Sequence, residues 1–316
     1  MKRDPVKVIY IAGDSRSGST LLGLMLGQLP GFFCAGEVRY LPQRGLMENQ
    51  LCGCGAAFGD CLFWHRAIQA GFGGLDAGMA RHLYRLQLVV DQPRSVFRNA
   101  FFSPRRFTAS YRRHRQQYLR HLGRLFSGIR QATDCEFVVD SSKVPSHGMM
   151  LGSMAGIDLH VIHMVRDCRA VAFSMLRRKR RPDIRGVDMY MATYPPWRAA
   201  LRWVMTNAAC ERLKLVGGGC SFVRYEDLIS DPVATIRVLL NDLGWPHPSL
   251  DFISGMKVHL APNHTVAGNP MRFRSGDVDL ILDEQWRDQM PPRQVWPVTI
   301  VSGHQMRRYG YMSGGA

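Results

Sequence analysis

The segment from Val8 to Thr20 carries the clearest chemistry in the chain. Its apolar run enters a loop with Gly13 and Gly18, and two hydroxyl residues then open an apolar stretch. Such a loop directs backbone N–H groups and a helix N-terminus at one anion. The Gly-x4-Gly spacing matches a nucleotide triphosphatase loop, but Ser19 replaces the lysine that reaches the β- and γ-phosphates there. Because the nearest cation is Arg16, inside the loop, the sequence predicts a site for one phosphate that carries a small anionic group.

Two further polar segments follow apolar runs. Lys143 ends the segment Val138-Val-Asp-Ser-Ser-Lys143, and Arg166 lies within Met164-Val-Arg-Asp167. In a parallel sheet both segments reach the same edge as the loop. Ser174 follows about two helical turns later, and an arginine with a hydroxyl in that arrangement can hold a second phosphate. The sequence therefore predicts a ligand with two separated phosphates, such as a 3′,5′-bisphosphorylated adenosine.

Apolar runs typical of buried strands alternate with helical stretches along the chain. This alternation predicts an α/β fold with a parallel sheet and ligand sites at the carboxyl ends of its strands. The segment from about His259 to Gly276 is expected to be a long loop. The predicted strands are Val6–Ala12, Glu136–Asp140, His160–Val165 and Ser221–Arg224. The predicted helices are Ser19–Gln28, a long region across Met79–Arg130, Ser146–Ala155, Arg169–Arg180, Trp197–Val216, Pro232–Leu243 and Pro292–Arg308.

In this order the motifs resemble those of sulfotransferases that use 3′-phosphoadenosine 5′-phosphosulfate (PAPS), bacterial members included. The resemblance extends from Val8 to about Arg272. It implies a P-loop-type three-layer α/β sandwich with a central parallel sheet flanked by helices. It also implies one domain over residues 1–316, with a helical acceptor-side insertion at about 40–130. The implied activity is transfer of the sulfuryl group to a hydroxyl of a small-molecule, lipid or glycan acceptor.

The resemblance also implies which residues bind PAPS and release its product, adenosine 3′,5′-bisphosphate. Those expected at the phosphosulfate are Ser15, Arg16, Ser17, Gly18, Ser19 and Thr20. Those expected at the 3′-phosphate are Arg166, Ser174 and Arg178. Tyr225, in the segment Tyr-Glu-Asp-Leu, is expected near the adenine, and Gly268, Asn269 and Arg272 are expected to close over the cofactor.

Glu37, Lys143 and Arg16 are the predicted catalytic residues. Glu37 matches a glutamate that acts as the general base in the tyrosylprotein and Golgi-type branches, and its alternative is a capping or ion-paired glutamate. Lys143 would offset charge on the oxygen that bridges sulfur and phosphorus, and its alternative is a surface lysine. The cytosolic branch has a histidine two residues after its lysine, where this chain has Pro145, so His147 is a weaker candidate base. The transfer needs no metal in principle, because the sulfonate carries a single charge.

A cysteine-rich segment precedes the predicted insertion helices. Cys52, Cys54 and Cys61, with His65, have the donor types of a zinc site. Their spacing matches no common zinc finger, so the sequence favours reduced thiols that brace a loop and predicts no metal ligand. A zinc site and a redox pair remain the alternatives. Eight cysteines in 316 residues do not indicate a disulfide scaffold.

The chain is strongly basic, with 41 Lys and Arg against 25 Asp and Glu, a formal net charge of +16. This balance fits an anionic ligand, an anionic membrane surface or nucleic acid. No nucleic-acid module is recognisable, so we expect no nucleic-acid partner, while peripheral membrane contact stays open. The alternative functions are a P-loop kinase or NTPase and a basic membrane- or nucleic-acid-binding protein. The polar N-terminus predicts a cytoplasmic location, and the sequence indicates neither the acceptor nor the oligomeric state.

Overall fold

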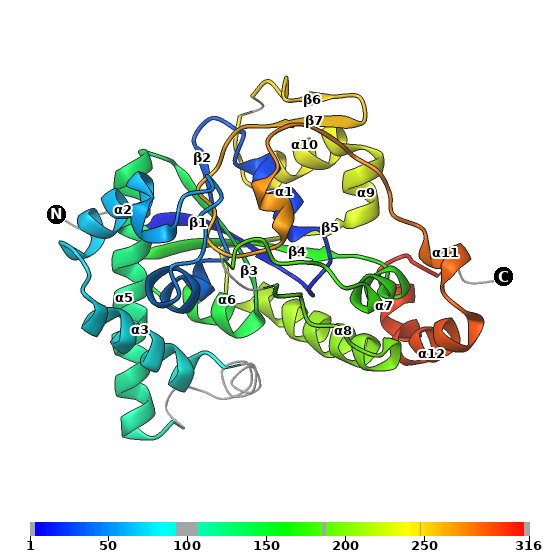
Figure 1. The fold of residues 1–316 in the computed structure, drawn as a ribbon, viewed down its shortest axis with the longest axis horizontal. Coiled ribbons are helices and arrows are strands. Elements are labelled where there is room, and N and C mark those ends of the chain that lie inside the picture. Colours follow the sequence, from blue (N-terminus) through cyan, green and yellow to red (C-terminus); the bar gives the residue numbers. More distant parts are fainter. Residues whose placement is uncertain (1–3, 93–106, 185–187, 247, 313–316) are drawn as a thin grey trace.

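A five-stranded parallel sheet with the strand order β2-β3-β1-β4-β5 forms the centre of the fold (Figure 1). The computed structural model describes residues 4–92, 107–184, 188–246 and 248–312. The strands are β1 Val6–Ala12, β2 Phe32–Gly36, β3 Phe137–Lys143, β4 Ile157–Val165 and β5 Gly219–Arg224. The loop after β1 therefore lies between the carboxyl ends of β3 and β4, where a parallel sheet places its ligands.

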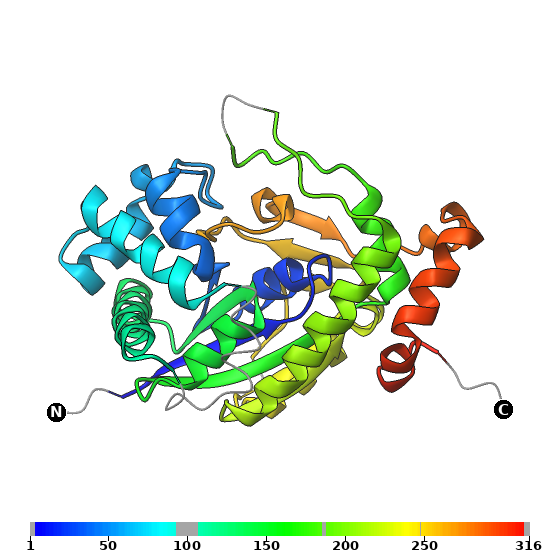
Figure 2. The ribbon, with the colours of Figure 1, turned by 90° about the horizontal axis from the view of Figure 1, so that it is seen from below.

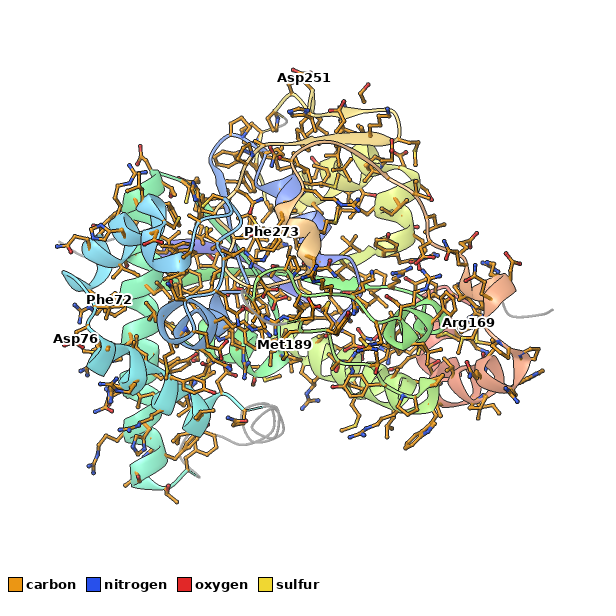
Figure 3. The ribbon with its side chains drawn as sticks, viewed as in Figure 1. Phe72, Asp76, Arg169, Met189, Asp251 and Phe273 are labelled. Carbon is orange, nitrogen blue, oxygen red and sulfur yellow. The ribbon has the colours of Figure 1, made fainter. Side chains whose placement is uncertain are left out.

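Helices cover both faces of this sheet, which makes three layers. In β1, Val8 and Tyr10 pack into one apolar core, whereas Ile9 and Ile11 pack into the other. A strand buried on both faces reads as a continuous apolar run, which explains why β1 was predictable. Helices α5, α6 and α8 cover the first face, and α1, α9 and α10 cover the second (Figures 1 and 2). Side chains fill the space between the sheet and both helical layers (Figure 3).

The helices of the described residues have the following bounds. They are α1 Ser19–Leu26, α2 Leu62–Phe72, α3 Ala77–Val90, α5 Ala109–Thr133, α6 Pro145–Gly152, α7 Cys168–Leu176, α8 Pro196–Glu211, α9 Tyr225–Ser230, α10 Pro232–Asp242, α11 Trp286–Gln289 and α12 Pro292–Arg308. Single helical turns cover Val38–Tyr40, Phe58–Asp60, Arg212–Leu215 and Pro270–Phe273, and a π-helical segment covers Leu41–Met47. Within the described part of the chain, every helix is too short or too polar to cross a membrane.

A small antiparallel sheet occupies part of the region expected to be a long loop. It consists of β6 Ile253–Ser254, β7 Lys257–Leu260 and β8 Gly276–Asp279. Val258 and Val278 pack into the same core as α1, so this sheet buries its apolar face against the second helical layer. The loop expected from about His259 to Gly276 overlaps β7 only at His259 and Leu260 and β8 only at Gly276, and the turn Pro270–Phe273 lies within it.

Several predicted elements are confirmed and others differ. The predicted bounds of β1 and α12 are those observed. Strand β2 and helix α2 were not predicted. The long helical region divides into α3 and α5, and residues 93–106 of that prediction lie outside the described residues. The helix expected over Arg169–Arg180 ends at Leu176 as α7.

Candidate active site

The loop between β1 and α1 is shaped by two glycines. Gly18 has a φ of 91° and forms the N-cap of α1. A Cβ atom there would lie 2.4 Å from Cδ2 of Tyr225, and one at Gly13 would lie 2.2 Å from the main-chain oxygen of Met164. Neither position has room for a side chain. The Oγ of Ser17 donates to the main-chain oxygen of Asp14 at 2.7 Å, which closes the loop on itself.

Arg16 is the loop residue with unused donors. It has a φ of 70°, which a non-glycine residue rarely adopts. Among the described residues, its buried Nη1 and Nη2 have no hydrogen-bond partner. Burial, with Arg202 and Arg166 nearby, lowers the pKa of its guanidinium. Buried donors normally find acceptors, and a guanidinium binds phosphate well, so these donors fit an anion in the loop.

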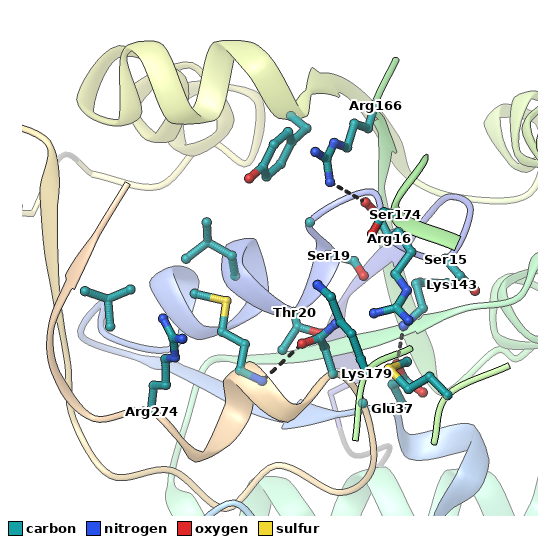
Figure 4. Close-up of a pocket in the computed structure, with 18 of the residues that line it drawn as sticks. Ser15, Arg16, Ser19, Thr20, Glu37, Lys143, Arg166, Ser174, Lys179 and Arg274 are labelled. Carbon is teal, nitrogen blue, oxygen red and sulfur yellow. Dashed lines mark hydrogen bonds and ion pairs between the residues drawn. The ribbon is translucent and has the colours of Figure 1, made fainter. Parts of the chain in front are cut away.

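A cavity of about 310 Å³ opens at this loop. Figure 4 shows Arg16, Lys143 and Lys179 close to Ser19 and Thr20 at the start of α1. Carboxylates are outnumbered in the cavity wall, since only Glu37 and Asp279 contribute them among the described residues. The cationic side chains that line it are Arg16, Arg44, Lys143, Arg166, Lys179 and Arg274. This excess of positive charge favours a ligand with several negative charges.

Arg166 and Ser174 lie in the wall of the same cavity, at the end of β4 and within α7. The guanidinium of Arg166 lies 4.5 Å from the centre of the Tyr225 ring. Its Nη1 donates to the main-chain oxygen of Arg16 at 3.3 Å, and its Nη2 donates to that of Asp283 at 3.1 Å. These contacts fix Arg166 beside the loop and leave Ser174 and the Tyr225 ring facing the cavity.

Glu37 and Lys143 meet at the ends of β2 and β3. The ammonium of Lys143 donates to the carboxylate of Glu37, and both side chains are largely buried. Lys143 has a φ of 69°, so two predicted catalytic residues have left-handed backbones. Such conformations persist where the surrounding structure enforces them and are concentrated at functional sites. The N–H of Glu37 donates to the main-chain oxygen of Val266 at 2.8 Å, which ties the glutamate to the segment before Gly268.

A second cavity, of about 740 Å³, lies on the other side of Lys143. Apolar side chains of α8, including Leu201, Val204 and Met205, form much of its wall. Three residues line both cavities: Ser15, Tyr40 and Lys143. The basic cavity and the apolar cavity therefore meet at Lys143, the residue predicted to offset charge on the leaving group.

Comparisons with known proteins agree with this architecture. A family model described as the sulfotransferase family matches residues 8–249. The chain belongs to this family. No curated protein matches it. The solved sulfotransferase domain from the olefin synthase of Synechococcus PCC 7002 has 22% identity and a TM-score of 0.52, covering 95% of this chain and 96% of that one. The sulfotransferase domain from the curacin biosynthetic pathway has 17% identity and a TM-score of 0.49, covering 96% and 98%.

Some predicted cofactor residues of the sulfotransferase lie away from the basic cavity. Arg178 is exposed, and its guanidinium lies 4.3 Å from the Tyr190 ring centre. Arg272 is 1% exposed and donates to the main-chain oxygens of Thr265 and Leu51, at 2.8 and 2.6 Å. Burial lowers its pKa to about 10. Neither arginine is part of the cavity wall, so their cofactor roles rest on the resemblance alone.

The neighbours of these two arginines do line the cavity and were not predicted. Lys179 follows Arg178, and Arg274 lies two residues after Arg272. Burial, with Arg16 and Arg166 nearby, lowers the pKa of Lys179. Among the residues expected at the cofactor, Ser15, Gly18, Ser19, Thr20, Tyr225, Gly268 and Asn269 line the cavity, whereas Ser17 acts within the loop. The sequence has a basic residue at every position of 177–181. This run was a signal for the missed residue, but it does not indicate which of the five faces the ligand.

His147 of the sulfotransferase is held away from both cavities. Its side chain is fully buried, with Nδ1 3.1 Å from Asp91 Oδ2 and Nε2 3.3 Å from Asp140 Oδ2. Burial alone would lower its pKa, but hydrogen bonds to Asp140 and Asp91 raise that pKa to about 9. Asp91 also accepts from Arg39 Nε at 3.0 Å and from Ser146 Oγ at 2.7 Å. This network braces the end of β3 and leaves Glu37 as the candidate base beside Lys143.

Proposed function

We propose that this sulfotransferase transfers the sulfuryl group of PAPS to a hydroxyl on an acceptor with an apolar body. The observation that carries the proposal is the shared wall of the two cavities. One side presents unpaired guanidinium donors and an excess of cations, and the other presents apolar side chains of α8. Lys143 belongs to both sides. A donor nucleotide in the basic cavity would meet an acceptor in the apolar one at this residue.

The basic cavity suits two phosphates held apart. The loop over 13–18, with Arg16, would hold the phosphosulfate, and Arg166 with Ser174 would hold the 3′-phosphate. The ring of Tyr225 would pack against the adenine. Gly268 and Asn269 would cover the nucleotide from the far side. When bound, PAPS supplies an activated sulfuryl group and a leaving phosphate.

Glu37 and Lys143 would serve the transfer itself. Glu37 would accept the proton of the acceptor hydroxyl as its oxygen forms a bond to sulfur. Lys143 would then offset the charge that develops on the phosphate oxygen as its bond to sulfur breaks. Arg16 would hold the same group from within the loop. The contact between Glu37 and Lys143 orients both side chains toward one point.

The apolar cavity supports small-molecule or lipid acceptors over glycans. Leu201, Val204 and Met205 offer no polar groups for a sugar, whereas they would desolvate an alkyl or ring system. Tyr40, from the region at about 40–130, lines the apolar cavity as well as the basic one, which supports an acceptor-side role for this region.

The main alternative function is that of a magnesium-dependent kinase or NTPase, which has the most similar motifs. The surroundings of Asp140 argue against this function. A Walker B aspartate must reach magnesium beside the loop. Here the Oδ1 of Asp140 accepts from the N–H of Ser142 at 2.8 Å and from its hydroxyl, and its Oδ2 faces His147. Asp140 is 0% exposed and lines neither cavity.

Calorimetric titration with adenosine 3′,5′-bisphosphate, against ATP with magnesium, tests the proposal. We expect the bisphosphate to bind without magnesium and the Arg166→Ala variant to bind it more weakly. Arg287→Ala is the control, because Arg287 pairs with Glu284 on an exposed surface. Binding of ATP only with magnesium would favour the kinase. Binding of vesicles or oligonucleotides without bisphosphate affinity would favour the basic binding protein.

A further inference from the structure

Three thiols and an imidazole converge beside the basic cavity. Cys52, Cys54, Cys61 and His264 bring one ligand atom each to within 4.8 Å of one another. The Sγ of Cys54 lies 3.9 Å from that of Cys61. The Nδ1 of His264 lies 3.3 Å from the Sγ of Cys61 and 3.9 Å from that of Cys52. The sequence favoured plain thiols, because the spacing of Cys52, Cys54, Cys61 and His65 matches no common zinc finger.

Three of the six separations between these donors are close to those of a tetrahedral zinc site. Zn–S bonds of about 2.3 Å and Zn–N bonds of about 2.0 Å place sulfur atoms about 3.8 Å apart and sulfur about 3.5 Å from nitrogen. The three measured separations lie within about 0.4 Å of these values. Four protein donors complete the coordination and leave no position for water or substrate. A disulfide would use two of the thiols and leave the third thiol and the imidazole without a role.

We propose that Cys52, Cys54, Cys61 and His264 bind a structural zinc ion. Binding would displace the thiol protons, and three thiolates with Zn²⁺ leave one negative charge. The buried guanidinium of Arg272 faces this charge, since it donates to the carbonyls of Leu51 and Thr265, each next to a ligand in sequence. Arg272 thus both joins the two ligand-bearing segments and supplies the opposite charge.

His264, not His65, is the fourth ligand. His65 lies in α2 with an exposed side chain, so its position in the motif does not bring it to the cluster. His264 is positioned by residues next to the motif. Trp64 Nε1 donates to the main-chain oxygen of His264 at 2.9 Å, and the Phe63 ring stacks on the imidazole at 5.2 Å. The imidazole is therefore oriented toward the thiols before any ion binds.

The zinc would fix the segment that leads into the cofactor cavity. Gly53 N–H donates to the main-chain oxygen of Thr265 at 3.0 Å, so the cysteine loop and the segment after His264 are already in register. Gly268 and Asn269 follow shortly after His264 and line the cavity. Loss of the metal would loosen both, and the resulting loss of bisphosphate affinity is the one consequence that rests on the proposed function.

The test begins with the metal content of the purified protein. We expect about one zinc per chain by plasma mass spectrometry. Cys61→Ser and His264→Ala should lose the zinc, whereas the matched controls His65→Ala and Cys220→Ser should keep it. Cobalt should replace zinc and give the absorption of a tetrahedral thiolate complex. These readouts stand even if the protein binds no bisphosphate, so failure of the proposed function would be distinguishable.

His264→Cys keeps the proposal testable if the alanine variant does not fold. A fourth thiol at this position should retain the metal and the cobalt spectrum, because a set of four cysteines also binds zinc. A protein without metal that fails to take up zinc or cobalt would overturn the proposal. A disulfide among the three cysteines in freshly purified protein would also overturn it, as would equal loss of zinc in His65→Ala.

Discussion

The carboxylate of Glu37 accepts a hydrogen bond from the ammonium of Lys143, and this contact joins the carboxyl ends of the neighbouring strands β2 and β3. The side chains are 8% and 15% exposed, so little water screens the pair. Removing the Glu37 side chain would leave the ammonium of Lys143 buried without its acceptor. A variant that keeps the hydrogen bond but cannot accept a proton therefore separates catalysis from structure.

Glu37→Gln is that variant, because its amide oxygen still accepts from Lys143. We expect kcat to fall about 10²- to 10⁴-fold, the usual contribution of a general base, with unchanged affinity for adenosine 3′,5′-bisphosphate. Glu136→Gln is the matched control, since Glu136 pairs with Lys7 at 2.5 Å at the opposite end of the sheet. Steady-state rates and calorimetry measure both effects. Full activity in Glu37→Gln would remove Glu37 as the base.

The neighbours Arg178 and Lys179 should differ in their effect on cofactor affinity. Lys179→Ala removes a cation from the cavity wall and should weaken bisphosphate binding about tenfold or more, as for a hydrogen bond to a charged group. Arg178→Ala removes only the contact with Tyr190 and should leave the dissociation constant within about twofold. Calorimetry at fixed ionic strength compares them. A larger loss in Arg178→Ala would restore the contact that the resemblance implies.

The end of α7 explains why Arg178, which the resemblance implied at the 3′-phosphate, lies outside the cavity wall that includes Ser174. A helix continued to Arg180 would place Arg178 on the same face as Ser174, one turn later. The helix ends at Leu176, and Arg177 has an extended backbone with a φ of −80° and a ψ of 126°. Helical spacing no longer applies beyond it. An end point of this kind depends on tertiary packing, which local pattern does not report.

Other parts of the site differ in how far sequence could predict them. The loop over 13–18 and the ends of β3 and β4 were predictable, because apolar runs and their polar termini are local signals. Strand β2 was not predicted because it is short and contains small residues, Cys34 to Gly36, that have little preference for strands. His264 lies more than 200 residues from the cysteines it meets, and no local pattern encodes such a contact.

Substitution of Arg272 should lower stability, whereas substitution of Arg274 should weaken cofactor binding. Arg272→Ala removes the donor to the carbonyl of Leu51 and one of the two donors to that of Thr265, whose other donor is the N–H of Gly53, and should cost about 2–4 kcal/mol of unfolding free energy. Arg274 is exposed and lines the cavity, so Arg274→Ala should leave the melting temperature unchanged and weaken bisphosphate binding. Thermal unfolding and calorimetry on both variants test these two effects. Equal stability of the two would contradict the structural role of Arg272.

The apolar cavity predicts a dependence on acceptor length. For primary alcohols of increasing chain length, each methylene that enters the cavity should raise kcat/KM up to about fourfold, the value of burying one such group. Met205→Glu should flatten this dependence, because it places a charge in the wall. Val238→Glu, on an exposed surface of α10, should not. Activity that rises with hydroxyl count instead of alkyl length would favour a glycan acceptor.

His147 should make stability depend on pH. Its pKa of about 9 in the folded protein lies above its ordinary value of 6.5, so the folded state binds the extra proton between these values. The stabilisation is therefore complete below about pH 6.5 and is lost as the pH rises to about 9, by roughly 3 kcal/mol.

Denaturant unfolding of wild type and His147→Gln at several pH values between about 6 and 9 measures this loss. The variant should be less stable near the acidic end of this interval, because Asp91 and Asp140 then face no cation at this position, and its curve should be flatter throughout. His259→Gln is the control. His259 also pairs with an aspartate, Asp277, at 2.7 Å, but its side chain is 65% exposed, so water screens the pair. Parallel curves for wild type and His147→Gln would mean that folding adds no proton to His147, and the network would then hold Asp91 through Arg39 and Ser146 alone.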